Sequence, residues 1–552
     1  MPALRQSRRA CQREIDSARR FTVDAGANRQ RIGRRTSCVD VVSFECGRAY
    51  QPHTSRILPS TRRRLGPWPR STKFATALAS AAIAKTSCGV TVADLVDLFC
   101  LQIVGNGDER YQYTIANDGD SMWLCCKPYP KLAAFRVHTS EHWLAILESR
   151  HPMAIDMGLD RVRAVWDRLG EPWPAPVCVV VGGTNGKGST VAMLAAIYRA
   201  AGYRVGTYTS PHIHRYHERV AVDGEPISEA DLVAAFERVE AARGAVSLTY
   251  FEFGTLAAFV HLAGAGLDVA VLEIGLGGRL DAVNLIDGDA SILTSVDLDH
   301  QAYLGDTREQ IGWEKAHIFR AGKPAVIGEP DVPGTVLAVA GQVGADVFAV
   351  GREFWSGLDG EGWRFEFGGG QSEAFALALP LPALRAPCQL RNGACAVMTT
   401  QLLSDRLPVT HEAIASGLIN VKLAGRLQRL DRAVETWADV AHNPESARTL
   451  AAWLAAQPAR TTIAVFAALA DKDLAGIVVP LQNAFAHWIT VELRPNPRAV
   501  SAEELALRLR NLGVPATPAT NTDAALDQAD RLAGADGRIV IFGSFHTVAQ
   551  FA

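Results

Sequence analysis

Short apolar runs alternate with amphipathic stretches along the chain from residue 177 onward. The run PVCVVVGG at 176–183 is followed by VAMLAAIYRAAG at 191–202, which has the pattern of a helix. Further strand-like runs follow, namely YRVGTYTS, DVAVLEIG, ASILTSV and PAVIG. This alternation is typical of a mostly parallel sheet with helices on both faces. We therefore predict an α/β fold for this part of the chain.

A second, shorter series of the same kind begins near residue 433. Its strand-like runs are VETWADVAHNP, TTIAVFAAL, AFAHWITVEL and GRIVIFGSF. We predict a smaller, Rossmann-like α/β domain at 426–552, after a larger domain at 137–425. Between the two series, residues 345–390 are rich in Gly, Phe and Leu without strong helix signals, and we predict hairpins or loops there.

The beginning of the chain differs from the rest. Residues 1–70 contain sixteen arginines, no lysine and five acidic residues, with no sustained period. Transit peptides and basic arms that bind nucleic acid share this composition, but we predict that residues 1–136 are a disordered extension or no part of the native enzyme. A regular amphipathic pattern begins only at 140–170. Val137 or a neighbour is therefore the expected start of the enzyme.

Composition narrows the class of protein. The 552 residues are 48% hydrophobic with a net charge of −2, which gives no general reason to expect nucleic acid or a membrane as partner. No uninterrupted apolar run reaches the roughly 18–20 residues that a membrane-spanning helix needs. Only three of the ten cysteines follow residue 136, as is usual in a reducing cytoplasm. We expect a cytoplasmic protein.

A glycine-rich turn follows the first strand-like run. In VVVGGTNGKGST (179–190), glycines let the backbone approach a phosphate, Lys187 supplies positive charge, and Ser189 or Thr190 can face a metal ion. The common phosphate-loop pattern has a glycine five residues before Gly186, where this chain has Val181. The pattern predicts a phosphate-binding loop, and an ordinary glycine turn is the alternative.

Candidate metal ligands follow three later strands. Ser210 ends one strand, although Thr-Ser-Pro alone more often marks a simple turn. Glu273 follows a buried strand, where an ionised carboxylate needs compensation from a cation or hydrogen bonds, and magnesium is favoured over an ion pair. His300 follows a further strand; a lone histidine is usually structural, and magnesium prefers oxygen ligands. All three share one edge of the predicted sheet, where ligands of such folds bind.

The turn GLGGRLD (275–281) adds an arginine and a carboxylate at the same edge. Arg279 and Asp281 suit an anionic or hydrogen-bonding substrate, or they pair with each other.

Taken together, these motifs resemble the folylpolyglutamate synthase and dihydrofolate synthase family within the Mur ligases. The motifs that carry the likeness are GTNGKGS, TSPH, EIGLGGRLDAVN, DLDHQAYLGDT, EKAHIF, QLRN, AGR, DVAHNP, ALADKD and GSFHTV. Their order and spacing match over about 140–552, and the family carries the shortened loop GTxGK, which accounts for Val181.

The resemblance implies a role for each matching residue. The ATP phosphates would be bound by Thr184, Asn185, Gly186, Lys187, Gly188 and Ser189, with further ATP contacts from Asn392, Arg426 and Asp439. Magnesium, as two ions, would involve Ser210, Glu273 and His300, and Lys315 falls where the family has a carbamylated lysine. The catalytic residues would be Lys187, Lys315 and His300. The pteroate pocket would be lined by Thr249, Tyr250, Phe251, Glu252, Leu280, Asp281 and Ala282, with Phe251 stacking on a pterin ring.

The implied activity is ligation of L-glutamate to dihydropteroate and to reduced folates by a monomeric enzyme. ATP would convert the acceptor carboxylate to an acyl phosphate, which the glutamate amine attacks. The alternatives are a folylpolyglutamate synthase without the first activity, a cell-wall Mur ligase, a phosphate-loop kinase or GTPase, and a non-catalytic nucleotide-binding module. Four positions depart from the family's usual residues: Val283, His317, Cys388 and Val440.

Overall fold

The computed structural model describes residues 100–104, 110–117, 122–128, 139–151, 153, 155–368, 374–493 and 498–551. The chain divides into two compact units, Met1–Arg136 and Val137–Ala552. Within the first unit, the backbone of β1 (Cys100–Val104), β2 (Arg110–Asn117) and β3 (Met122–Pro128) forms an antiparallel sheet that we did not predict. The other residues of segment 1–136 lie outside the described residues. The prediction made for this segment therefore stays a prediction.

An eight-stranded sheet forms the centre of the larger lobe of the second unit, in the order β11-β10-β9-β4-β8-β5-β6-β7. The first six strands of that order are mutually parallel. Strand β6 runs antiparallel to both of its neighbours, β5 and β7. Their bounds are β4 (Val177–Gly182), β5 (Val205–Tyr208), β6 (Val220–Val222), β7 (Glu225–Pro226), β8 (Val269–Glu273), β9 (Ala290–Leu293), β10 (Pro324–Ile327) and β11 (Asp346–Ala349). Each strand predicted in this part of the chain is confirmed.

Alternate residues of the central strands face two separate cores. On β4, Val177, Val179 and Val181 pack on one side, and Cys178 and Val180 on the other. Strands this deeply buried read as continuous apolar runs, which is why the sequence marked them. Helices α6 (Lys187–Ala200), α12 (Gln389–Leu402) and α13 (His411–Asn420) contribute to the first core. The second core receives α4 (Ser140–Arg150), α5 (Asp160–Leu169), α7 (Glu229–Arg243), α8 (Tyr250–Ala263), α10 (Arg308–Ala316) and α11 (Gly334–Val343).

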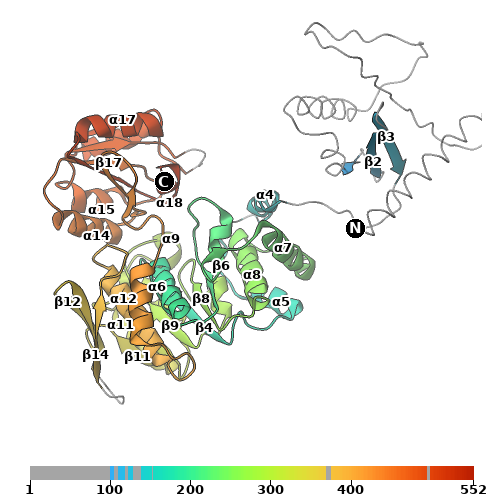
Figure 1. The fold of residues 1–552 in the computed structure, drawn as a ribbon, viewed down its shortest axis with the longest axis horizontal. Helices are drawn as coiled ribbons and strands as arrows, with labels where there is room; N and C mark the ends of the chain where they lie inside the picture. The colour runs from blue at the N-terminus through green and yellow to red at the C-terminus, as the bar shows by residue number, and fades with distance from the viewer. Residues whose placement is uncertain are drawn as a thin grey trace, which may run out of the picture. The chain divides into compact units, whose positions relative to one another are not determined.

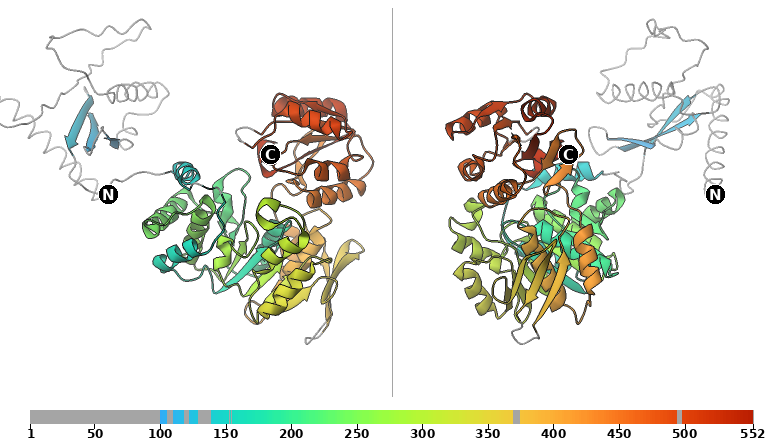
Figure 2. Two further views of the ribbon diagram at one scale, coloured as in Figure 1. Left: turned by 180° about the vertical axis from the view of Figure 1, so that it is seen from behind. Right: turned by 60° about the vertical axis from the view of Figure 1, so that its left-hand side comes forward.

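Two regions add detail to the predicted pattern. The amphipathic stretch at 140–170 forms two helices, α4 and α5, separated by residues 151–159. The Gly-, Phe- and Leu-rich region contains β12 (Phe354–Asp359), β13 (Gly362–Phe367) and β14 (Phe375–Pro380), which pair as an antiparallel sheet, so the hairpin prediction is confirmed. Figures 1 and 2 show this small sheet, in gold, beside the large one.

The smaller lobe is built on a six-stranded sheet, orange to red in Figure 1, in the order β15-β16-β20-β17-β18-β19. All neighbours are parallel except β15 and β16. Its elements are β15 (Gln428–Leu430), β16 (Glu435–Ala438), α14 (Pro444–Ala455), β17 (Thr462–Phe466), α15 (Leu474–Val478), β18 (His487–Thr490), α16 (Ala502–Asn511), β19 (Ala516–Pro518), α17 (Thr522–Ala533), β20 (Arg538–Phe542) and α18 (Phe545–Phe551). The predicted second α/β fold is confirmed, and the boundary at 425/426 stays a prediction.

Helix length bears on membrane insertion. In the part of the chain that the structure describes, no helix is both long and apolar enough to span a bilayer.

Candidate active site

The carboxyl ends of β4, β5, β8 and β9 lie in register at one edge of the large sheet, because Val181 pairs with Glu273, Gly182 with Leu293 and Tyr208 with Leu272. The loops that leave this edge line a cavity of about 520 Å³, together with residues of the smaller lobe. Of the residues predicted to bind ATP, a metal ion or the pteroate group, all but Tyr250 line it, and the further candidate Arg279 does not.

The glycine-rich turn between β4 and α6 is held tightly against β9. Gly183 has φ 144°, and a Cβ there would come within 2.0 Å of the Thr294 hydroxyl. The Thr184 N–H donates to the Ser295 carbonyl at 2.8 Å. Gly186 has φ 84° and begins α6 without a side-chain cap. The first amides of α6 are therefore available to an anion, as at other helix N-termini.

Two lysines converge on one carbonyl of this turn. The Lys187 ammonium donates to the Gly183 and Thr184 carbonyls at 3.1 Å each, and the Lys315 ammonium donates to Gly183 at 2.9 Å. Burial and, to a smaller extent, the charge on Lys187 together lower the pKa of Lys315 to about 7. Near neutral pH, the side chain of Lys315 is therefore an uncharged amine in part of the molecules. Lys187 is its neighbour at the Gly183 carbonyl.

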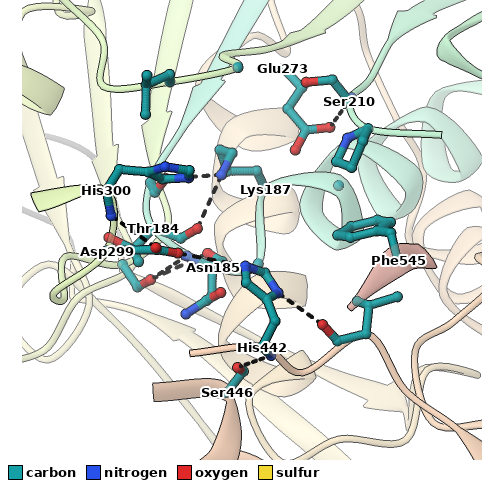
Figure 3. Close-up of a pocket in the computed structure, with 18 of the residues that line it drawn as sticks. Thr184, Asn185, Lys187, Ser210, Glu273, Asp299, His300, His442, Ser446 and Phe545 are labelled. Atoms are coloured by element: carbon teal, nitrogen blue, oxygen red, sulfur yellow. Dashed lines mark hydrogen bonds and ion pairs between the residues drawn. The ribbon is translucent and has the colours of Figure 1, made fainter. Parts of the chain in front are cut away.

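Glu273 ends β8 inside the cavity, and its side chain is buried. Its carboxylate accepts the Ser210 backbone N–H at 3.0 Å, as Figure 3 shows. Burial raises the pKa of Glu273, while Lys187 and the Ser210 amide oppose that rise. A buried carboxylate beside a serine gives hard oxygen donors, the kind that Mg²⁺ and Mn²⁺ prefer.

His300 precedes the short helix α9 (Gln301–Leu304) with a left-handed φ of 52°. Burial lowers its pKa to about 4, so its ring is neutral at pH 7 and keeps a lone pair for a metal ion. Figure 3 shows His300 on one side of Lys187, and Glu273 with Ser210 on the other. No cluster of three His, Cys, Asp or Glu side chains with metal-binding geometry occurs among the described residues, so the three-residue metal site stays a prediction.

The three predicted ATP contacts outside the loop also reach the cavity. Asn392 on α12 lies against Gly186, where a Cβ would come within 2.6 Å of its amide oxygen. Arg426 lies 5.0 Å from the centre of the Phe545 ring, and burial lowers its pKa. Asp439 follows β16 and accepts the backbone N–H groups of Leu427 and Ala441 at 2.9 and 2.8 Å. The cavity wall thus combines side chains from both lobes.

The predicted pteroate pocket forms around the start of α8. Thr249 and Glu252 cap this helix reciprocally, since each side chain accepts the other residue's backbone N–H. The Phe251 ring packs against Gly275, where a Cβ would meet it at 2.4 Å. Tyr250 is not among the residues that line the cavity, and its place in the pteroate pocket stays a prediction. One residue along a helix rotates the side chain by about 100°, and Tyr250 therefore turns away.

Asp281 lines the same cavity, together with its neighbours Leu280 and Ala282. Its carboxylate accepts the Leu276 and Val283 backbone N–H groups at 2.8 and 2.9 Å. Burial nevertheless raises the pKa of Asp281 to about 7. Arg279 does not pair with it; the Arg279 guanidinium pairs with Glu314 at 2.9 Å instead. Asp281 therefore keeps a carboxyl group that can act as a donor or an acceptor near neutral pH.

A polar cluster between the lobes was not predicted from the sequence. The Asn185 amide donates to the carboxylate of Glu445 at 2.6 Å and to the amide oxygen of Asn443 at 3.0 Å. The carboxylate of Asp299 pairs with Lys472 at 3.0 Å and accepts from Asn443 at 2.9 Å. Asn443 and Lys472 belong to motifs recognised in the sequence, but their partners lie more than 140 residues away.

His317, one of the departures from the family's usual residues, does not crowd the Lys315 side chain. The His317 ring packs on Trp313, with ring centres 4.4 Å apart, and bonds to the Trp313 carbonyl at 2.7 Å. It is therefore held one helical turn back along the chain, clear of the cavity that Lys315 lines.

Comparison with known proteins agrees with this architecture. Residues 181–343 match the Mur ligase middle domain, and residues 425–545 match the Mur ligase glutamate ligase domain. The dihydrofolate synthase/folylpolyglutamate synthase of Escherichia coli (strain K12) is 42% identical over 409 residues, which is 74% of this chain and 93% of that protein. The protein of the same description from Mycobacterium tuberculosis is 34% identical over 66% of this chain and 80% of its own length.

Solved structures give the same result. E. coli FolC in complex with DHPP and ADP superposes with a TM-score of 0.70 at 41% identity, covering 75% of this chain and 96% of that chain. A bifunctional folylpolyglutamate synthase/dihydrofolate synthase with Mn, AMPPNP and L-glutamate bound superposes with a TM-score of 0.69 at 42% identity, covering 75% and 97%. The chain belongs to the dihydrofolate synthase/folylpolyglutamate synthase family of the Mur ligases.

Proposed function

We propose that this protein is an ATP-dependent ligase that joins L-glutamate to dihydropteroate and to reduced folates through an acyl phosphate. The observation that carries the proposal is that one cavity holds the glycine-rich turn, the buried Glu273 and the aromatic pocket around Phe251. A phosphate donor and an aromatic carboxylic acid can therefore meet there. Relatives with bound ADP, DHPP, AMPPNP, Mn and L-glutamate support the same substrates.

The turn and Lys187 would hold the ATP phosphates and draw negative charge from the transferred γ-phosphoryl group. Asn392, Arg426 and Asp439 would contact the rest of the nucleotide. Ser210, Glu273 and His300 would hold Mg²⁺, which when bound neutralises phosphate charge. The oxygen donors of Glu273 and Ser210 and the neutral ring of His300 suit that ion.

The acceptor carboxylate attacks the γ-phosphorus of ATP, and ADP leaves with the electrons of the broken bond. The amine of L-glutamate then attacks the acyl carbon, and phosphate leaves as the amide forms. Contacts between the lobes, such as Asn185 to Glu445, would keep water away from the acyl phosphate. Lys315 would act as a carbamate, because its neutral form can take up CO₂ and become an anion.

ATP-dependent incorporation of glutamate, measured separately with dihydropteroate and with a reduced folate monoglutamate, tests the function. We expect both acceptors to react. Reaction with the folate alone would leave a folylpolyglutamate synthase, and reaction only with a UDP-sugar peptide would indicate a cell-wall ligase.

A variant pair tests the assignment of the loop. Lys187→Ala should abolish ligation with either acceptor while the circular dichroism spectrum stays unchanged. Lys323→Ala, which removes an ammonium from a partly buried ion pair with Asp289 outside the cavity, is the matched control and should retain activity. Full turnover by Lys187→Ala would contradict the assignment.

We also propose that residues 137–552 carry the whole activity, as a cytoplasmic monomer without a nucleic-acid or membrane partner. Support comes from the E. coli relative, 93% of which is matched by 74% of this chain, and from Cys178, Cys388 and Cys395, which are free thiols. Equal specific activity of the full chain and of residues 137–552 is the expected result. Size-exclusion chromatography with light scattering measures the oligomeric state.

A further inference from the structure

Arg219 is a buried cation that the proposed chemistry has not yet used. It ends the 3₁₀ turn Tyr216–Arg219, and its carbonyl accepts the Thr209 N–H at 2.8 Å. Only 9% of the residue is exposed, yet its side chain lines the active-site cavity. Burial of a guanidinium is costly unless an anion compensates it.

No carboxylate of the described residues pairs directly with this guanidinium. Among the described residues, no Asp or Glu oxygen lies within 4.0 Å of the Arg219 nitrogens. The neighbouring carboxylate of Glu218 instead accepts the backbone N–H groups of Ile213, His214 and Arg215 at 2.7–2.9 Å. Glu218 thus fixes the loop without neutralising the arginine.

Arg219 is nevertheless held firmly in place. Its Nε donates to Nδ1 of His212 at 3.0 Å. Its guanidinium carbon lies 5.0 Å from the centre of the Tyr216 ring and 5.7 Å from that of Tyr250. These contacts fix the plane of the guanidinium and use only Nε, so both terminal amino groups are available to a ligand. This also gives Tyr250 a role outside the cavity wall.

The position of Arg219 in the cavity indicates which ligand it can bind. Tyr250, which it contacts, lies between Thr249 and Phe251, both in the wall of the aromatic pocket. The charge on Arg219 also lowers the pKa of Glu273, so the phosphate end of the cavity is within its electrostatic reach. A pteroyl group whose ring lies in the aromatic pocket and whose carboxylate points toward the ATP phosphates would extend from that pocket to the phosphate end of the cavity.

We propose that Arg219 binds a carboxylate of the pteroate or folate acceptor with its terminal amino groups. This inference rests on the proposed function. The planar guanidinium matches a carboxylate in a two-pronged arrangement that a lysine cannot reproduce. The bound group is either the benzoyl carboxylate of dihydropteroate or the α-carboxylate of the terminal glutamate of a folate.

The test compares Arg219→Gln and Arg219→Lys with the wild-type protein. Loss of a charge-assisted pair should raise the KM for the acceptor at least about tenfold in Arg219→Gln, with a smaller rise in Arg219→Lys. The KM values for ATP and L-glutamate should stay within about twofold. Arg364→Gln, on an exposed arginine of β13 that pairs with Glu366, is the matched control.

The two acceptors distinguish the two carboxylates. A raised KM for dihydropteroate alone assigns the benzoyl carboxylate, which is an amide in a folate. A raised KM for the folate alone assigns the α-carboxylate, and a raised KM for both means that Arg219 binds a carboxylate of each acceptor. An unchanged acceptor KM in Arg219→Gln, or a rise confined to L-glutamate, overturns the proposal. If the wild-type protein ligates neither acceptor, the proposed function fails instead.

Direct binding separates recognition from folding and from turnover. In the presence of ADP, the wild-type protein should bind pteroate at least about tenfold more tightly than its decarboxylated analogue. Arg219→Gln should lose this preference and keep the affinity for the analogue, which a misfolded protein could not do. Retention of the preference in Arg219→Gln would refute the assignment to the benzoyl carboxylate, and the KM for the folate then decides the α-carboxylate.

Discussion

The ion pair between Asp299 and Lys472 joins the two lobes beside the active site, and its removal gives a quantitative prediction. Asp299 follows β9 in the larger lobe, and Lys472 lies in the smaller one. Their side chains are only 12% and 11% exposed, so solvent screens the pair weakly. The perturbation is a cycle of Asp299→Asn, Lys472→Met and the double variant.

The distance sets the size of the effect. At 3.0 Å, two unit charges attract by about 5 kcal/mol with an effective dielectric constant of about 20. Desolvation of both groups offsets much of this attraction. The net coupling that we expect is about 2 kcal/mol, near the lower end of values measured for close charge pairs. That energy corresponds to about 30-fold in an equilibrium constant.

The surroundings of Asp299 support a strong interaction. Burial alone would raise the pKa of this carboxyl, but the neighbouring His442 ring and the charge of Lys472 hold it well below its usual range. The Asn443 amide also donates to it at 2.9 Å. Each single variant therefore leaves an uncompensated polar group between the lobes, whereas the double variant removes both charges.

The assay is kcat/KM for glutamate ligation across the cycle. We expect each single variant to lose at least tenfold, and the double variant to lose about 30-fold less than the product of the two single losses. If the loss in the double variant equals the product of the two single losses to within a factor of two, the reasoning is refuted. The same cycle on the exposed pair Arg364 and Glu366, about half exposed at both ends, should show coupling below about 0.5 kcal/mol.

Two further predictions concern the loop and its lysine neighbour. Because burial lowers the pKa of Lys315 to about 7, its neutral fraction should rise from about one tenth at pH 6 to about nine tenths at pH 8; recovery of CO₂-depleted enzyme on addition of bicarbonate should follow this rise, and recovery independent of pH would contradict it. Gly186→Ala places a Cβ within 2.6 Å of Asn392 at φ 84° and should weaken ADP binding at least tenfold by calorimetry, whereas Gly322→Ala, at φ 61° with open space around it, should cost only about 1 kcal/mol of stability.

The sequence predicted those features that depend on local pattern. Strands β4 and β8 are buried on both faces, so their apolar runs were visible, and the residues that follow them had to meet at one edge of the sheet. Glu273 was identifiable because a carboxylate at the end of such a strand is costly without a partner. Strand ends alone thus placed the glycine-rich turn, Ser210, Glu273 and His300, whereas the remaining ATP and pteroate contacts came from the family resemblance.

Features that depend on side-chain direction or distant contacts were not accessible. Tyr250 belongs to a motif whose neighbours line the pocket, but the start of α8 turns its ring toward Arg219. Arg219 itself gave no signal, because a sequence does not show whether an arginine has an acidic partner. The contact of Asn185 with Glu445 joins residues 260 positions apart. No periodicity predicts such a pair.

Asn185 belongs to the glycine-rich turn and also connects the two lobes. It therefore links phosphate binding to the arrangement of the smaller lobe. Asn185 lies one position before Gly186, and its amide group exchanges hydrogen bonds with Asn443 at 3.0 Å in both directions. Glu445, which also accepts from Asn185, lies in the first turn of α14. Any movement of the turn on phosphate binding must therefore change contacts that position α14. Because the acyl phosphate hydrolyses in water, an enzyme of this chemistry gains from sealing the cavity only when the nucleotide is present.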